Sequence, residues 1–187
     1  YYRHIEMVDH EIGKLLRALE DSGREKETLI IFTSDHGEGM GHHQMVRKST
    51  FYEDTISVPL IFSWPGHIPE GKTDITHLAS GLDIFPTICD YLNIDPPPSM
   101  RGMSLKPILE NEKTEGNKFV VSEVSSNTGR MVRTKEYKYI VYKDDDAEQL
   151  FNMQQDPVEM KNLAEEPRYA GVIQEHRKML KEWEQKL

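Results

Sequence analysis

Two side chains that could bind a cation and an anion follow one another directly at Asp35 and His36. A carboxylate supplies the oxygen ligands that a hard divalent cation such as calcium prefers, and an imidazole adds a nitrogen ligand or a hydrogen bond to a bound anion. Equally, an aspartate here can cap a turn beside a solvated histidine. The two residues alone leave both interpretations open.

The loop that follows favours a binding site. Glycines that allow close backbone approach stand at Gly37, Gly39 and Gly41. Side chains that can carry positive charge follow at His42, His43, Arg47 and Lys48. A metal ion can polarise one oxygen of a sulfuryl or phosphoryl group while lysine and histidine neutralise the others. The loop therefore indicates an oxyanion site beside a divalent cation.

Two apolar runs place this loop at the edge of a sheet. Residues 28–33 and 58–62 are short and rich in β-branched side chains, as is typical of strands buried on both faces. Helical spacing over residues 5–19 and a short helix capped by Asp83 flank them. Ligands of open α/β sheets bind beyond the carboxyl ends of the strands. We therefore expect an α/β fold with mainly parallel, buried strands, flanking helices and a site directly after residue 33.

The pattern changes in the polar linker formed by residues 110–117. Closely spaced strand-like segments follow at residues 119–124, 131–134, 137–142 and 149–152, and helical spacing returns over residues 170–187. We expect a small antiparallel sheet with a terminal helix. The predicted domains are residues 1–112, the carboxy-terminal part of an α/β catalytic domain, and residues 113–187, the small sheet subdomain.

Charge and cysteine usage narrow the class of protein. The chain has 23 basic and 32 acidic residues, a net charge of −9, which disfavours nucleic acid as a partner. No apolar stretch approaches the roughly 20 residues that span a bilayer. Cys89 is the only cysteine, so no intrachain disulfide forms and cysteine usage assigns no compartment. A periplasmic, secreted or lysosomal parent protein is compatible with this composition.

These motifs resemble the type I sulfatases of the alkaline-phosphatase-like superfamily, especially the branch with the iduronate and choline sulfatases. The order and the gaps of the motifs match over nearly the whole chain, as the carboxy-terminal portion of such an enzyme. The matching segments are residues 28–37, Gly41-His42-His43, Lys48, Phe51-Tyr52-Glu53, residues 58–62, Trp64-Pro65-Gly66, residues 83–87, residues 101–105, residues 149–152, Asp156-Pro157 and Asn162-Leu163.

The resemblance implies roles for four residues. Asp35 and His36 would bind the metal, calcium in this family, or face the sulfate. Lys48 would contact the sulfate and take part in catalysis. His43 falls where part of the family has a catalytic-site histidine in Gly-x-His-Gly, although Gln44 replaces that glycine here. The substrate would be a sulfate ester, with a sulfated carbohydrate suggested by the resembling branch.

The chain departs from the family in its nucleophile. Family sulfatases use a formylglycine made from the Cys or Ser of a Cys/Ser-x-Pro/Ala-x-Arg motif. Cys89 is not followed by such a motif and lies in an apolar helical stretch, so we expect it to be a buried core residue. The resemblance implies that the formylglycine and the other metal ligands belong to a missing amino-terminal part of the same protein. The chain alone would then be inactive.

Other classes stay open. Phosphonate monoester hydrolases and phosphoethanolamine transferases of the same superfamily also carry Ser-Asp-His-Gly after a buried strand, as at residues 34–37. The spacing to Lys48 and the motif at residues 149–152 favour the sulfatase. An autonomous binding domain is the alternative outside enzymes.

Overall fold

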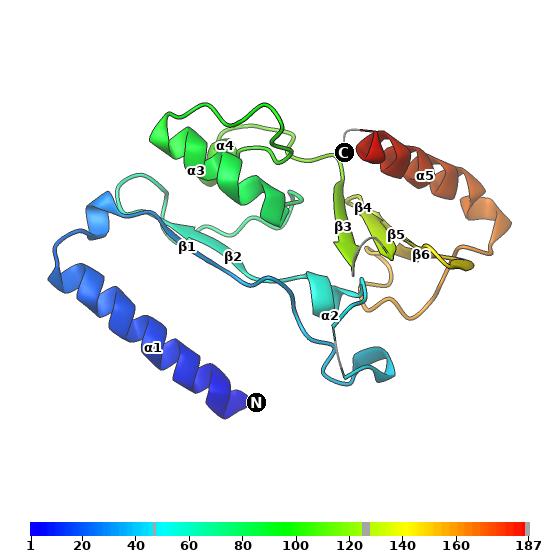
Figure 1. Cartoon of the computed structure of the whole chain (residues 1–187), viewed down its shortest axis with the longest axis horizontal. Coiled ribbons are helices and arrows are strands. Elements are labelled where there is room, and N and C mark those ends of the chain that lie inside the picture. Colours follow the sequence, from blue (N-terminus) through cyan, green and yellow to red (C-terminus); the bar gives the residue numbers. More distant parts are fainter. Residues whose placement is uncertain (47, 125–127, 186–187) are drawn as a thin grey trace. The chain divides into compact units, whose positions relative to one another are not determined.

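The contacts of the chain divide it into two compact units. The computed structural model describes residues 1–46, 48–124 and 128–185. One unit comprises residues 1–33 and 59–73, and the other comprises residues 34–58 and 74–187. Figure 1 labels the helices and strands of both units. The domain boundary expected between residues 112 and 113 stays a prediction.

The first unit begins with the predicted amphipathic helix, α1 (Tyr2–Asp21). The helix ends where Gly23 adopts a left-handed conformation with φ of +70°, which glycine accepts without steric cost. Residues of its apolar stripe, among them Ile5, Val8 and Leu15, are exposed. A 3-10 turn, Glu25–Glu27, leads from this helix to the first strand.

The first unit also holds a two-stranded sheet of β1 (Ile30–Thr33) and β2 (Leu60–Ser63). The strands pair antiparallel, with Ile30 opposite Ser63, so the expectation of parallel pairing is wrong for this pair. Parallel pairing needs a crossover, usually a helix. The described residues between the two strands form only a 3-10 turn, His42–Gln44, and the four-residue helix α2 (Glu53–Ile56) before the chain returns. Phe32 and Ile61 are exposed, so burial on both faces is also not met within this chain.

The second unit contains the helix that was predicted to start at Asp83, α3 (Ile84–Leu92), preceded by a 3-10 turn, Gly81–Asp83. Asp83 is the N-cap residue of α3, as predicted, although its carboxylate makes no cap hydrogen bond to this helix. The carboxylate is buried and instead accepts hydrogen bonds from the backbone of Ser80 and Met103 and from the Asn117 side chain. Asp83 thus joins three separate segments, including the one that leads into α4 (Lys106–Leu109).

The predicted small antiparallel sheet is present as four consecutive strands. They pair in the order β3 (Val120–Val124), β4 (Gly129–Arg133), β5 (Tyr137–Tyr142) and β6 (Asp145–Asn152). The turn between the last two strands lies at Lys143 and Asp144.

Neighbouring residues of this sheet enter two different cores, because side chains alternate between the faces of a strand. Val132, Tyr139 and Leu150 join the core that includes Ile173 and Leu180 of the terminal helix α5 (Ala170–Glu184). A 3-10 turn, Pro167–Tyr169, leads into that helix. The adjacent residues join the second core, which contains Phe51, Met131, Ile140, Phe151 and Met153. The sheet is therefore covered by α5 on one face and by the segment around Phe51 on the other.

The whole is a mixed α/β fold with a four-stranded antiparallel sheet and a terminal helix, as predicted. Cys89 is buried, which confirms its predicted place in the core. Within the described part of the chain, no helix has both the length and the apolar character needed to cross a membrane.

Candidate functional site

The predicted site begins directly after β1, at Asp35. Its carboxylate accepts hydrogen bonds from the backbone N–H of His36 at 2.9 Å and from the Ser34 hydroxyl at 3.3 Å. The backbone hydrogen bond is the main cause that lowers the pKa of Asp35 below its usual value. The side chain is 83% exposed. Asp35 therefore presents an ionised carboxylate that is open to a cation.

His36 links Asp35 to Lys48. Its Nδ1 lies 2.8 Å from the carbonyl oxygen of Gly37, and its Nε2 lies 2.7 Å from Lys48 Nζ. A carbonyl can only accept and an ammonium can only donate, so Nδ1 must carry the proton and Nε2 must accept from Lys48. The Asp35 carboxylate is 3.3 Å from the same Nε2. Three of the four predicted residues thus form one cluster of carboxylate, imidazole and ammonium.

His43, the fourth predicted residue, has different neighbours. Its ring stacks on Tyr52 with a centroid distance of 3.8 Å and an interplanar angle of 5°. Its backbone φ is +50°, in the left-handed region that few non-glycine residues adopt. The structure gives it no hydrogen bond or ion pair with Asp35, His36 or Lys48. Arg47, which the sequence places in this loop, lies outside the described residues.

Backbone hydrogen bonds connect the start of the loop after β1 to α2. The backbone N–H groups of Gly37 and Glu38 donate to the carbonyl oxygens of Thr55 and Asp54 at 2.8 and 3.0 Å. A side chain at position 37 is not tolerated here, because a Cβ would lie 2.0 Å from the Asp54 oxygen. The Asp54 carboxylate also lies 3.0 Å from Nδ1 of His42. These contacts attach the chain around His36 to α2.

Sequence reasoning missed the contributions of Tyr52, Asp54 and Thr55. Tyr52 supports His43, and the carbonyl groups of the other two residues hold the backbone directly after His36. Backbone acceptors carry no residue-type signal, so no pattern at residues 54–55 could have predicted them. A stacking partner for a histidine can be any nearby ring, so nothing in the sequence indicated that Tyr52 stacks on His43.

The cluster does not by itself complete a metal centre. Among the described residues, no group of three or more His, Cys, Asp or Glu side chains is arranged to hold a metal ion. Asp35 presents an exposed carboxylate, whereas both ring nitrogens of His36 have hydrogen-bond partners, and calcium takes about six to eight ligands. The donor types fit a calcium site, but only a part of one.

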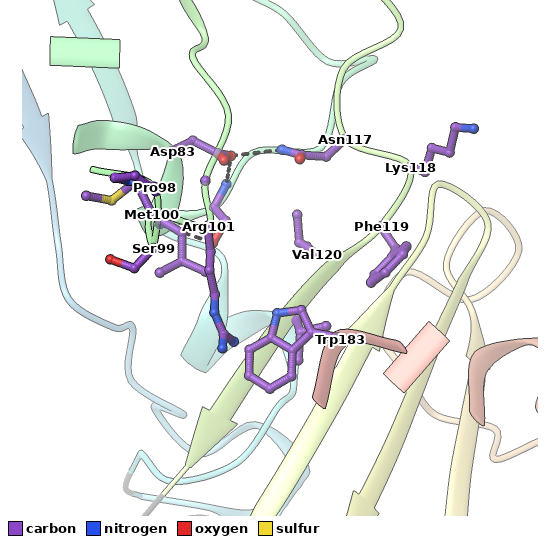
Figure 2. Close-up of a pocket in the computed structure, with 14 residues that line it drawn as sticks. Asp83, Pro98, Ser99, Met100, Arg101, Asn117, Lys118, Phe119, Val120 and Trp183 are labelled. Atoms are coloured by element: carbon purple, nitrogen blue, oxygen red, sulfur yellow. Dashed lines mark hydrogen bonds between the residues drawn. The ribbon is translucent and has the colours of Figure 1, made fainter. Parts of the chain in front are cut away.

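A hollow of about 560 Å³ lies elsewhere in the second unit, between the segment around Arg101 and the start of the sheet. Figure 2 shows Trp183 beside Arg101, whose guanidinium carbon is 5.1 Å from the centre of the indole ring. The buried carboxylate of Asp83 and Asn117 also face this hollow. None of the four predicted site residues lines it.

A carboxylate and an imidazole thus follow β1, and the Lys48 ammonium reaches them from later in the same loop. The family described as N-sulphoglucosamine sulphohydrolase, C-terminal, matches residues 41–186. A Delta 4,5-hexuronate-2-O-sulfatase of Bacteroides thetaiotaomicron is 37% identical over 98% of this chain and 40% of its own length. The chain belongs to the sulfatase family, as the sequence predicts.

Solved structures share the fold. A protein solved in complex with its substrate, D-glucosamine-2-N,6-O-disulfate, superposes with a TM-score of 0.85 at 30% identity over 97% of this chain and 39% of that one. The phosphonate monoester hydrolase of Agrobacterium radiobacter gives a TM-score of 0.84 at 32% identity over 98% of this chain and 40% of its own. The chain spans about 40% of the length of these relatives.

Proposed function

We propose that the protein containing this chain hydrolyses a sulfate ester, and that this chain contributes the part of the site that holds Asp35, His36 and Lys48. The observation that best supports this is the 2.7 Å contact between Lys48 Nζ and His36 Nε2, beside the exposed carboxylate of Asp35. A negative group for a cation and a positive group for an anion lie together in one loop. This is the arrangement that a metal-assisted attack on a sulfuryl group needs.

Asp35 is the proposed calcium ligand of this chain. His36 stays the predicted second ligand, a role in which its Nε2 would bind the metal ion in place of the Lys48 ammonium. The Asp35 carboxylate is ionised at neutral pH, since its pKa lies below the usual 3.8, and its exposure leaves the oxygens accessible. A bound calcium ion would withdraw charge from a sulfuryl oxygen. We propose that the remaining ligands and a formylglycine nucleophile come from a part of the same protein outside this chain. That upstream part would also cover the exposed apolar stripe of α1.

Lys48 is the proposed sulfate-binding cation. Its ammonium has three hydrogens, of which one points to His36, so two remain available to sulfate oxygens. A charge placed before the reaction stabilises the negative charge that develops on these oxygens without reorganisation. His36 orients this ammonium because its Nδ1–H is held by the Gly37 carbonyl. His43 stays a predicted catalytic residue, positioned by Tyr52.

A sulfated carbohydrate is the proposed substrate class. One relative acts on the 2-O-sulfate of a hexuronate, as its name states, and another was solved with a disulfated glucosamine as its substrate. A phosphonate monoester is the second candidate, because the phosphonate monoester hydrolase of Agrobacterium radiobacter shares this fold at 32% identity.

The test uses the whole protein and a chromogenic aryl sulfate. Replacing Asp35 by alanine should abolish turnover and leave the fold intact, since the side chain is exposed. Lys48→Ala should lower kcat by roughly 10²-fold, because it removes charge stabilisation in the transition state. Lys72→Ala, a control at another exposed lysine, should leave kcat unchanged. Full activity of the Asp35→Ala protein would overturn the proposal, and a higher kcat/KM for a phosphonate monoester would favour the second candidate.

A further inference from the structure

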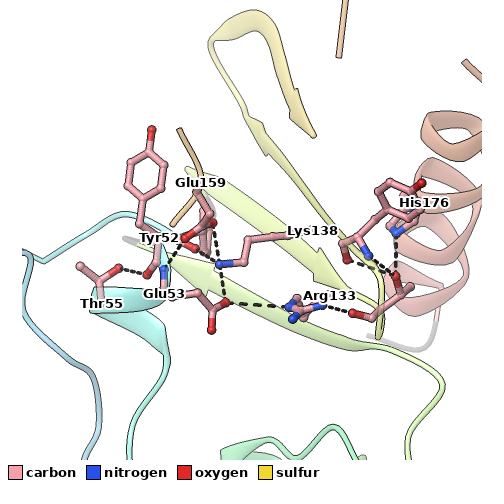
Figure 3. Close-up of polar contacts among 10 residues, drawn as sticks. Tyr52, Glu53, Thr55, Arg133, Lys138, Glu159 and His176 are labelled. Carbon is pink, nitrogen blue, oxygen red and sulfur yellow. Dashed lines mark hydrogen bonds and ion pairs between the residues drawn. The ribbon is translucent and has the colours of Figure 1, made fainter. Parts of the chain in front are cut away.

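The second unit contains a charged side chain that is fully buried. Lys138 of β5 has an exposed fraction of 0%, and its Nζ lies 2.6 Å from Glu53 and 2.7 Å from Glu159. The ammonium also donates to the Phe51 carbonyl oxygen at 2.9 Å. The ammonium thus has one hydrogen bond and two ion pairs. Figure 3 shows Lys138 extending from the sheet to Glu53 and Glu159. Lys138, Glu53 and Glu159 are called the Lys138 triad below.

The triad joins three parts of the chain that are distant in sequence. Glu159 has a side-chain exposure of 1% and accepts a hydrogen bond from the backbone N–H of Glu53 at 2.7 Å, over a separation of 106 residues. Its φ of +57° is a strained value for a residue other than glycine. Glu53 belongs to α2, Lys138 to β5 and Glu159 to the turn that follows β6. The triad therefore connects these three segments.

The triad holds α2, and α2 is hydrogen-bonded to the loop that contains Asp35, His36 and Lys48, called the site loop below. Glu53 is the first residue of α2, and the next two residues of this helix, Asp54 and Thr55, accept the backbone hydrogen bonds of Glu38 and Gly37. His36 lies immediately before these two residues, and its Nε2 accepts from Lys48. A continuous path of hydrogen bonds and ion pairs therefore runs from the Lys138 ammonium through α2 to the backbone beside His36.

Burial of this charge has a cost that packing alone would not impose. A buried ion pair is often no more stabilising than apolar residues of the same volume, and its attested benefit is the choice of one arrangement. Apolar side chains around Phe51 already attach this segment to the sheet. The triad adds directed contacts, which an apolar core cannot supply.

We propose that Lys138, together with Glu53 and Glu159, is a positioning residue of the sulfatase site. It makes no contact with substrate. It sets the place of α2 against the sheet, and α2 in turn sets the place of His36 and of the Lys48 ammonium. The inference rests on the proposed function for its effect on turnover, but its effect on the backbone can be measured independently.

The experiment replaces both buried charges together in the whole protein, by Lys138→Met with Glu159→Gln. The glutamine can still accept from the Glu53 N–H, and no unpaired charge remains in the core. The hydrogen-exchange rates of the Gly37 and Glu38 amides are measured, and kcat and KM are determined with an aryl sulfate. We expect at least about tenfold faster exchange of these two amides. We also expect kcat to fall by about tenfold or more, since a displacement of about 1 Å can cost about 10²-fold, with KM changed much less.

Two further variants separate positioning from general stability. Leu180→Ala weakens the core under α5, on the other face of the sheet, and should lower Tm without changing exchange at Gly37 and Glu38. Glu53→Gln keeps both buried charges paired, removes one contact of Lys138 and should change exchange and kcat in the same direction by a smaller factor. If the double variant fails to fold, Glu53→Gln alone tests the proposal by the same exchange and kcat measurements.

Wild-type exchange of the two amides in a folded double variant would overturn the positioning role. Equal acceleration by Leu180→Ala would do the same. If the wild-type protein does not hydrolyse sulfate esters while the exchange result holds, the proposed function fails and the positioning of the loop stands.

Discussion

A methyl group at position 37 should separate the site loop from α2. In Gly37→Ala the new Cβ would lie 2.0 Å from the Asp54 carbonyl oxygen, and real Cβ contacts do not fall below 3.0 Å, so the backbones must part by about 1 Å. Two hydrogen bonds span this junction, from Gly37 to Thr55 and from Glu38 to Asp54. At a net value of about 1 kcal/mol each, their loss costs about 2 kcal/mol.

The assay combines stability and rate in the whole protein. Because His36 precedes the displaced residue, we expect kcat for an aryl sulfate to fall by about 10²-fold, the effect of a displacement of about 1 Å at a reacting centre. Urea unfolding should show the loss of about 2 kcal/mol. Gly81→Ala is the matched control, since no atom lies within 4 Å of a Cβ there. A Gly37→Ala protein with wild-type kcat and stability would refute this reasoning.

Three further predictions concern groups outside the site loop. Hydrogen bonding to Asp74 is the main cause that raises the pKa of His77. For Asp74, desolvation acts to raise the pKa, but the hydrogen bonds from His77 and Thr76 outweigh it and lower the pKa of Asp74 to about 2. The stability from this pair should therefore be greatest between the unfolded pKa values of 3.8 and 6.5, falling as Asp74 is protonated near pH 2 and as His77 loses its proton above pH 6.5. In Asp74→Asn, an NMR titration should show the His77 pKa return towards 6.5, and an unchanged value would contradict the assignment. Thr87→Val should cost about 1–3 kcal/mol in urea unfolding, because the buried hydroxyl donates to the Asp83 carbonyl and accepts from the Leu105 N–H, while the exposed Thr73→Val should cost little. Cys89 should react with a thiol reagent only after unfolding, and rapid reaction of the native protein would contradict its burial.

Local patterns predicted most of the elements. The helical spacing of the first segment and the alternation along residues 119–152 became α1 and strands β3 to β6. Alternation also determines that Met131 and Val132 enter different cores, since consecutive residues face opposite sides of a strand. Pairing direction is different, because periodicity is the same in parallel and antiparallel strands. The antiparallel pairing of β1 with β2 depends on the path of the loop between them.

For the site, too, local sequence determined one part and the tertiary structure another. The sequence by itself determined that a carboxylate and an imidazole follow the first strand at Asp35 and His36, because adjacent residues stay adjacent in any fold. It also determined that Cys89 lies in an apolar stretch without a nucleophile motif. Only the tertiary structure decided that Lys48 meets His36, that His43 stacks on Tyr52 and that Lys138 is buried between two glutamates. These contacts join residues from 9 to 85 positions apart, and such pairs are set by loop paths and core packing rather than by local spacing.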